Sequence, residues 1–260
     1  MARALIGLGS NLGDCAQLVR AAVEALQGPE CRLLALSDLV ISPAVGGPPG
    51  QRDYVNAVAL VETPWSTIRL AEELEDVESQ LGRKRTVHWG PRRIDLDLLV
   101  EDRPPHITRS LVVPHPRMTL RPFVLGPASQ VAPSFPHPLL RQTMRELWEH
   151  LRRTPRWIYW RPDPRLDKGS EAGASVESLR RKLGPAWYIG ASYPSDPSAL
   201  PRLAVCCQDD PNVRVDVKPG PAGDLLTALP IPPSGWDTSA LCDMVALIEG
   251  TETPLRRLAP

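Results

Sequence analysis

The sequence contains few cysteines and aromatic residues, carries no net charge and lacks a long apolar run. None of its five cysteines forms a C-x-x-C pair, which argues against a zinc site or a disulfide framework. Basic and acidic residues balance at 30 each, so composition indicates neither a nucleic-acid nor a membrane partner. The first apolar run, Ala4 to Leu8, is too short for a signal peptide. We therefore expect a cytoplasmic protein, and the odd cysteine count fits a reducing compartment.

The most informative stretch is Trp89 to Val100, where a turn leads into an alternating strand. Successive side chains of a strand point to opposite faces, so Asp95 and Asp97 share one face while the aliphatic residues enter the core. Two neighbouring carboxylates repel each other unless a cation lies between them, and Mg²⁺ prefers oxygen ligands. An exposed edge strand would carry the same D-x-D pattern. The preceding loop favours a metal–polyphosphate site because it is strongly basic, with Arg83, Lys84, Arg85, His88, Arg92 and Arg93.

Periodicity predicts an α+β fold for the first part of the chain. Strands are expected at 4–9, 33–41, 55–62 and 94–100, and helices from Asp14 to Gly28 and from Thr63 to Gly82. The order strand, helix, strand, strand, helix, strand is that of a ferredoxin-like βαββαβ sandwich. The proline- and glycine-rich segment 42–50 is predicted to be a loop, and 139–151 a further helix. We place a first domain at residues 1–152.

Residues 153–260 are expected to form a separate C-terminal α/β module. Short buried strands are predicted at 157–160, 187–190 and 203–207, and helices at 175–183 and 238–248. The segment shows no P-loop, nucleophile or metal motif. A structural role or the binding of a protein partner is therefore favoured over a second activity.

Several motifs in residues 1 to about 150 resemble one family, the 6-hydroxymethyl-7,8-dihydropterin pyrophosphokinases of folate biosynthesis. Each motif alone is weakly specific, but their order and spacing together are highly specific. They are Gly9-Ser10-Asn11-Leu12-Gly13, Asp53-Tyr54-Val55-Asn56-Ala57, Trp89-Gly90-Pro91-Arg92, Asp95-Leu96-Asp97, Pro114-His115-Pro116-Arg117-Met118, and the pair Arg121 and Phe123.

The resemblance implies an enzyme whose pterin hydroxymethyl oxygen attacks the β-phosphorus of ATP and releases AMP. In this family Asp95 and Asp97 would hold two Mg²⁺ ions, and Arg83 and Arg92 would complete the catalytic set. The same resemblance assigns nucleotide binding to Glu78, Arg85, His88, Trp89, Leu98, His115 and Arg121. It assigns pterin binding to Ser42, Pro43, Val45, Tyr54, Asn56, Trp89 and Phe123, with the pterin stacked between the last two rings.

Two residues depart from the family pattern. His88 stands where a lysine or arginine is common, and Ser110 where some members carry arginine, so ATP affinity is expected to be altered. A catalytically inactive pterin- or ATP-binding regulator is the alternative, although both aspartates argue against it. An RNA-binding module is disfavoured because the central strands lack the aromatics that such sheets use.

Overall fold

The computed structural model describes residues 1–45, 47–83, 90–153 and 255–258, together with the strands at 157–161, 188–190, 203–207 and 228–231. The chain divides into two compact units, Met1–Trp148 with Glu252–Pro260, and Glu149–Thr251. The first unit therefore contains both ends of the chain. The predicted helices at 175–183 and 238–248 lie outside the described residues.

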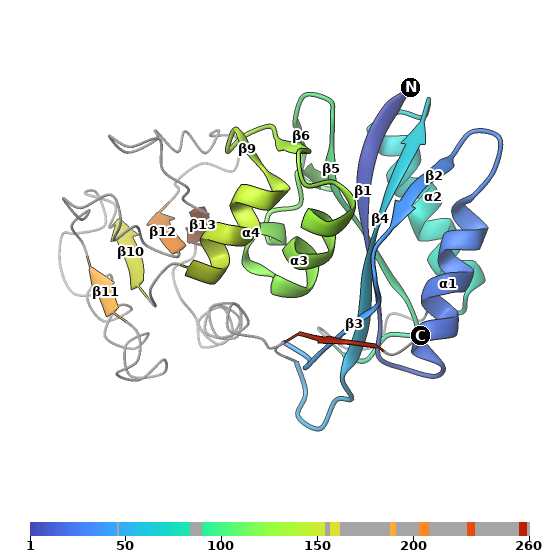
Figure 1. Cartoon of the computed structure of the whole chain (residues 1–260), viewed down its shortest axis with the longest axis horizontal. Coiled ribbons are helices and arrows are strands. Elements are labelled where there is room, and N and C mark those ends of the chain that lie inside the picture. The colour runs from blue at the N-terminus through green and yellow to red at the C-terminus, as the bar shows by residue number, and fades with distance from the viewer. Residues whose placement is uncertain are drawn as a thin grey trace. The chain divides into compact units, whose positions relative to one another are not determined.

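A six-stranded antiparallel sheet forms the centre of the first unit (Figure 1). Its main path runs β14-β3-β4-β1-β5, and β2 pairs separately with β4. The strands are β1 (Ala2–Ser10), β2 (Arg32–Leu36), β3 (Val40–Ser42), β4 (Tyr54–Thr63), β5 (Asp95–Glu101) and β14 (Arg256–Arg257). The prediction of a fold that combines helices and strands is confirmed, and the sheet of this unit is antiparallel.

Helices α1 (Cys15–Leu26) and α2 (Thr67–Gln80) pack on one face of this sheet. Their apolar residues meet alternate residues of β1, β4 and β5 in one core, which includes Leu8, Ala57 and Leu96. Asp14 caps α1, as predicted, by accepting a hydrogen bond from the Gln17 amide.

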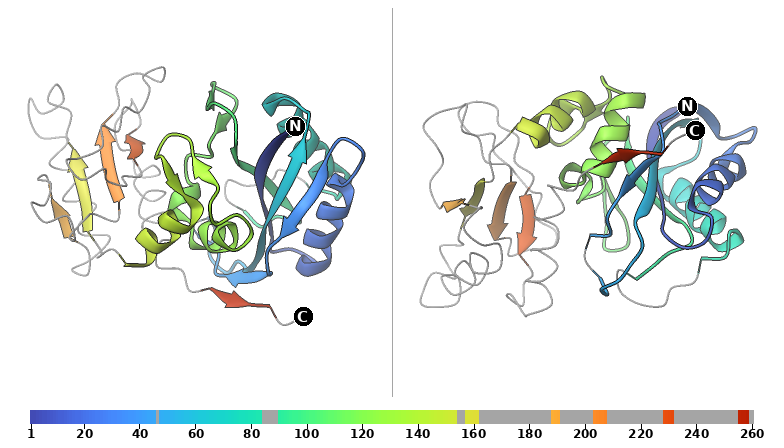
Figure 2. Two further views of the ribbon diagram at one scale, coloured as in Figure 1. Left: turned by 45° about the horizontal axis from the view of Figure 1, so that its top comes forward. Right: turned by 60° about the horizontal axis from the view of Figure 1, so that its bottom comes forward.

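Helix α3 (Pro122–Val131) lies on the opposite side of the sheet, after the 3₁₀ turn η1 (Met118–Leu120) (Figure 2). Before η1, the short strands β6 (His106–Ile107) and β7 (Val112–Val113) pair with each other. After α3, β8 (Pro136–His137) pairs with β9 (Gln142–Thr143), and α4 (Met144–Arg153) follows.

Three predicted boundaries were wrong. The strand expected at 33–41 is two strands, because the Ser37 hydroxyl and amide bond to Val58 and interrupt the regular pairing. Helix α2 begins at Thr67 rather than near Thr63, because Ser66 accepts the Arg69 amide as its cap. The last helix begins at Met144 rather than at 139, because β8 and β9 pair just before it.

The second unit contains a four-stranded parallel sheet in the order β11-β10-β12-β13. Its strands are β10 (Trp157–Arg161), β11 (Tyr188–Gly190), β12 (Leu203–Cys207) and β13 (Ala228–Ile231). Strands were expected at the first three places, and β13 was not expected.

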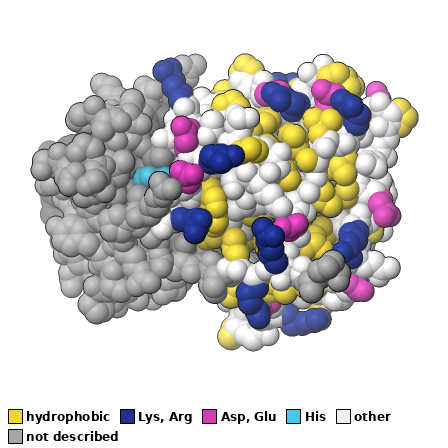
Figure 3. Space-filling view, viewed as in Figure 1, with side chains coloured by type: hydrophobic (Ala, Val, Ile, Leu, Met, Phe, Trp, Pro, Cys, Tyr) yellow, Lys and Arg dark blue, Asp and Glu magenta, His cyan; other side chains and the backbone are white. Residues whose placement is uncertain are grey.

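Charged side chains of both signs are interspersed with apolar ones over the described face in Figure 3. Within the described part of the chain, none of the helices has the length and hydrophobicity needed to cross a bilayer.

Candidate active site

The face of the main sheet opposite α1 and α2, here called the site face, brings the key motifs into register. Gly9 of β1 pairs with Asn56 on one side and with Asp95 on the other. One step along, Gly7 pairs with Val58 and with Asp97. The residues that alternate with these on β1, β4 and β5 lie in the core. Gly7, Gly9, Asn56, Asp95 and Asp97 therefore share the opposite face of the sheet, which is the site face. Two glycines thus separate an amide from a pair of carboxylates.

Gly9 has a steric reason to lack a side chain. A Cβ built there would lie 3.1 Å from the Asn56 Oδ1 and 3.7 Å from the Tyr54 ring. The absence of that atom lets the Asn56 amide lie beside β1. The glycine therefore keeps the middle of the site face open.

Asp95 is held by two arginines. Its carboxylate is 2.6 Å from the Arg92 Nη1 and 2.9 Å from the Arg83 Nη2. Burial and the neighbouring Asp97 raise the pKa of Asp95, although the two guanidinium groups oppose that rise. The two carboxylates therefore repel each other, as the sequence predicts for a pair on one face.

Asp97 faces a different pair of groups. Its Oδ2 is 3.2 Å from the Arg121 Nη1 and 3.9 Å from the His115 Nε2. Burial alone would raise the pKa of Asp97, but His115, Arg121 and Arg92 outweigh it and lower that pKa. These contacts and those of Asp95 form the charged end of the site face, defined as Asp95, Asp97, Arg83, Arg92, His115 and Arg121.

His115 is neutral near pH 7, because burial lowers its pKa to about 4. Its Nδ1 accepts a hydrogen bond from the Arg117 amide at 3.1 Å, so the ring proton belongs on Nε2, which points to Asp97. His115 can therefore donate a hydrogen bond to an oxygen at this position without carrying charge.

Glu78 lies beneath the charged end and is 3% exposed. Its Oε1 accepts the Leu96 amide at 2.6 Å and also bonds the Arg83 guanidinium. Burial raises the pKa of Glu78 to about 7 despite both donors. The structure thus gives Glu78 an internal partner, Arg83, while its predicted contact with the nucleotide stays a prediction.

The neutral end of the site face, defined as Ser42, Tyr54 and Asn56, is formed by β3 and β4. The buried Asn56 amide donates to the buried Ser42 hydroxyl at 2.9 Å. The Tyr54 hydroxyl is 3.5 Å from the Gly90 carbonyl, which follows the basic loop. This end offers hydrogen-bonding groups without a formal charge, which suits the edge of a neutral heterocycle.

Asn11 connects the two loops that border the site face, and sequence reasoning did not identify it as a site residue. Its side-chain Oδ1 accepts a hydrogen bond from the backbone amide of Arg92 at 2.7 Å, and its own backbone amide donates to the Arg92 carbonyl at 3.1 Å. Its side-chain nitrogen donates to Gln51 at 3.2 Å and to the Arg52 carbonyl at 3.3 Å. The available signal was an asparagine in the turn-rich string from Ser10 to Asp14.

The remaining predicted residues lie at separate places in the chain. Phe123 is half-buried in the first turn of α3, with the Arg121 guanidinium 5.8 Å from its ring centre. Pro43 and Val45 follow β3 at the start of the proline- and glycine-rich loop. Leu98 is in the core with Leu96, on the face away from the aspartates, so its predicted nucleotide role stays a prediction. Arg85, His88 and Trp89 lie outside the described residues. The Ser110 hydroxyl lies 3.4 Å from the Thr108 hydroxyl, in the turn between β6 and β7.

The donor set at Asp95 and Asp97 fits a hard cation. Within the described residues, no cluster of three or more histidine, cysteine, aspartate or glutamate side chains surrounds a common point. Mg²⁺ does not need one, since it is commonly held by one or two carboxylates plus substrate phosphates. The surrounding arginines provide bidentate donors for those phosphates.

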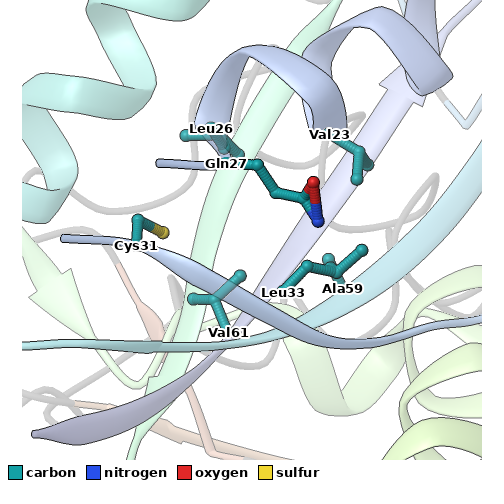
Figure 4. A pocket seen from close by; sticks show the side chains of 7 residues that line it. All are labelled: Val23, Leu26, Gln27, Cys31, Leu33, Ala59 and Val61. Atoms are coloured by element: carbon teal, nitrogen blue, oxygen red, sulfur yellow. The ribbon is translucent and has the colours of Figure 1, made fainter. Parts of the chain in front are cut away.

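A small hollow lies on the face of the sheet that α1 covers and is a packing feature (Figure 4). It has no volume for a water molecule. Burial raises the pKa of its Cys31 thiol, which disfavours the reactive thiolate. Its lining comes from α1, β2, β4 and the turn between α1 and β2: Val23, Leu26, Gln27, Cys31, Leu33, Ala59 and Val61.

The paired carboxylates and the converging cations on the antiparallel sheet form a site suited to a divalent cation and phosphate groups, as in enzymes that transfer phosphate groups. Comparison with known proteins gives the family. Residues 5–133 match the model of the 7,8-dihydro-6-hydroxymethylpterin-pyrophosphokinase family. The chain belongs to this family, and the predictions of a pyrophosphokinase, of a transferase and of folate biosynthesis are confirmed.

The relatives carry the same name, 2-amino-4-hydroxy-6-hydroxymethyldihydropteridine pyrophosphokinase. The Pseudomonas aeruginosa protein is 39% identical over 132 residues, which are 50% of this chain and 81% of the relative. The Bacillus subtilis protein is 38% identical over 129 residues, 49% of this chain and 77% of the relative. The Synechocystis protein is 32% identical over 182 residues, 67% of this chain and 85% of the relative.

Among solved structures, an HPPK-DHPS in complex with substrates aligns with 75% of this chain. The TM-score is 0.46 and the sequence identity 11%. This chain spans 58% of that structure's length.

Proposed function

We propose that the site face binds ATP at its charged end and 6-hydroxymethyl-7,8-dihydropterin at its neutral end, and transfers pyrophosphate between them. The observation that carries this proposal is the register Asn56–Gly9–Asp95, which sets an uncharged amide on β4 and a carboxylate on β5 level with each other on either side of β1. The pterin is a neutral heterocycle and the triphosphate a polyanion, so each end suits one substrate. The description of the matched family names both the pyrophosphokinase reaction and the pterin.

In the proposed reaction, the hydroxymethyl oxygen attacks the β-phosphorus of ATP and loses its proton. The bond from that phosphorus to the oxygen bridging the α-phosphate breaks, and AMP leaves. Two Mg²⁺ ions, bound by Asp95 and Asp97, would supply charge stabilisation on the phosphate oxygens. Arg83, Arg92 and Arg121 already point into this end and would bind phosphates by paired hydrogen bonds.

His115 would donate from its neutral Nε2 to a phosphate oxygen, with its ring fixed by the Arg117 amide. Asn56 would bond the pterin edge while Ser42 holds its amide orientation. Phe123, half-buried beside Arg121, would stack on one pterin face, with Trp89 proposed for the other. The remaining assignments proposed are Glu78, Arg85, His88 and Leu98 for the nucleotide, and Pro43, Val45 and Tyr54 for the pterin.

The proposal extends to fold and context. The order of the elements supports a ferredoxin-like assignment for domain 1–152, since it runs β1, α1, β2 with β3, β4, α2 and β5. An added α/β module at 153–260 would bind a protein partner. A cytoplasmic location would keep the buried, unpaired Cys15 and Cys31 reduced. The inactive alternative gains no support, since both carboxylates whose loss it would require are in place.

The test is a product analysis with purified full-length protein, ATP, Mg²⁺ and the pterin. Chromatography should show AMP rising in step with the pterin diphosphate. ADP would place the attack on the γ-phosphorus instead. Absence of turnover under conditions where a Bacillus subtilis relative is active would contradict the proposal.

A further inference from the structure

The last described segment of the chain, residues 255–258, docks beside the neutral end of the site face. Strand β14 pairs antiparallel with β3, with Arg256 opposite Ile41 and Arg257 opposite Val40 (Figure 1). The Leu258 amide extends this pairing by donating to the Leu39 carbonyl at 2.8 Å. Strand β3 is only three residues long, and β4 holds its other edge. Its outer edge is thus covered by a strand about 200 residues away in sequence.

The side chains of this segment contact the elements around the proposed pterin site. The Arg256 Nη2 is 2.7 Å from the Asp53 Oδ2, and Asp53 is the last residue of the loop before β4. Leu255 packs on Gly126 of α3, where a Cβ would lie 3.2 Å from the Leu255 Cδ1. The Arg257 Nη1 instead reaches Asp38, at 3.3 Å, on the side of β3 away from that loop.

These contacts bear on the neutral end because β3 and the loop after it carry its groups. Ser42 ends β3 and orients the Asn56 amide. The loop 43–53 is held at its end by Asn11, through Gln51 and Arg52, and by Arg256, through Asp53. Without β14, β3 would be an unpaired edge strand of three residues, and the loop 43–53 that follows it would lose one of its attachments.

We propose that β14 is a positioning element of the pterin site, and that Arg256 fixes the end of loop 43–53 through Asp53. The inference rests on the proposed function, since it needs the pterin at the neutral end. Arg256 touches no reacting atom, so its effect is on pterin affinity and not on the chemical step. Fixing the loop before the substrate arrives lowers the ordering cost of binding.

The first test compares three full-length variants in steady-state kinetics. Arg256→Ala should raise the pterin KM about two- to fivefold, as loss of one exposed ion pair allows, with kcat and the ATP KM unchanged. Arg256→Lys, which keeps the cation, should restore most of the affinity. Arg257→Ala is the matched control and should leave the pterin KM unchanged. Equal pterin KM values for Arg256→Ala and Arg257→Ala would overturn the assignment, as would a parallel change in the ATP KM.

The second test removes the strand pairing and not the charge. Leu258→Pro loses the amide that bonds Leu39, whereas Leu258→Ala keeps it. The proline variant should raise the pterin KM more than Arg256→Ala does and should speed hydrogen exchange at residues 40–42. Unchanged exchange and KM in the proline variant would refute a role for β14. If the wild type itself fails to use the pterin, the proposed function falls as well; an active wild type with unaffected variants contradicts only this inference.

Discussion

The charged end and the neutral end of the site face lie on either side of β1 and are held by different interactions. At the charged end, Asp95 and Asp97 are each neutralised by cations from separate loops and helices. At the neutral end, Ser42 and Asn56 are held by one buried hydrogen bond on paired strands. The first arrangement depends on charge balance and the second on strand register.

This difference indicates how one sheet can serve two substrates. A polyphosphate needs cations that can leave their carboxylates and contact oxygens, whereas a flat heterocycle needs donors and acceptors in fixed positions. Gly7 and Gly9 of β1 lie between the strands that carry the two ends. Substitutions at one end should therefore leave the other substrate unaffected.

The largest effect is expected at the carboxylates. Asp97→Ala and Asp95→Ala should each reduce kcat by roughly a thousandfold, because they remove the proposed Mg²⁺ ligands and the stabilisation of developing charge. Initial rates of AMP release at saturating ATP and pterin measure the loss. Asp76→Ala, an exposed aspartate on α2, is the control and should retain wild-type turnover. Activity within tenfold of wild type in both site variants would refute the metal assignment.

Glu78, beneath the charged end, should make stability depend on pH. Burial raises the pKa of Glu78 in the folded protein to about 7, against 4.5 for an ordinary glutamate, so between those pH values the native protein binds a proton that the unfolded chain has lost. The resulting stability is fully present below pH 4.5 and is lost as pH rises through 7, by roughly 3 kcal/mol. Glu78→Gln should remove this part of the decline.

Urea unfolding of the wild type and of Glu78→Gln at several pH values between 4.5 and 8 checks this prediction. The difference between the two free energies of unfolding isolates Glu78 from other titrating groups. Two parallel curves would show that Glu78 does not carry a raised pKa in the folded protein.

Arg92→Ala should have the next largest effect, lowering kcat by roughly a hundredfold through loss of one charged donor to the phosphates. The residue also neutralises Asp95, at 2.6 Å, so the variant should weaken ATP more than pterin. Arg69→Ala removes an exposed arginine that pairs with Glu73 on α2 and serves as the control. A higher pterin KM with normal ATP kinetics would place Arg92 at the wrong end.

The smallest effects are expected at the neutral end. Asn56→Ala should raise the pterin KM about tenfold, because it removes a buried hydrogen-bonding group, and should leave the ATP KM unchanged. Gly9→Ala should act in the same direction but more weakly, since its Cβ would displace the Asn56 amide by a few tenths of an ångström. Substrate titrations of both variants decide between this result and a general loss of activity.

Local patterns predicted much of the first unit and of the charged end. Helices α1 and α2 each bury one apolar stripe, and β5 alternates aliphatic residues with aspartates, which leaves a period in the sequence. Strand β1 is buried on both faces and shows as a compact apolar run. The same alternation predicted that Asp95 and Asp97 share a face. Helix α3 was not predicted, because Pro122, Gly126 and Pro127 weaken its local signal, although proline suits its first turn.

Features that depend on distant partners could not be predicted in this way. The contact between Gly9 and Asn56 requires the register of β1 with β4, and Asn11 joins loops 40 and 81 residues away. Strand β14 is two arginines without alternation, and its partner β3 lies near the start of the chain. Such pairings are set by tertiary packing and not by local propensity.

Nucleotide binding to Asn56→Ala and Asp97→Ala tests the division between the two ends most directly. Calorimetric titration with Mg²⁺ and a non-hydrolysable ATP analogue gives the Kd of each protein without the pterin. We predict a wild-type Kd for Asn56→Ala and a Kd at least tenfold weaker for Asp97→Ala. Equal weakening of nucleotide binding in both variants would contradict the account.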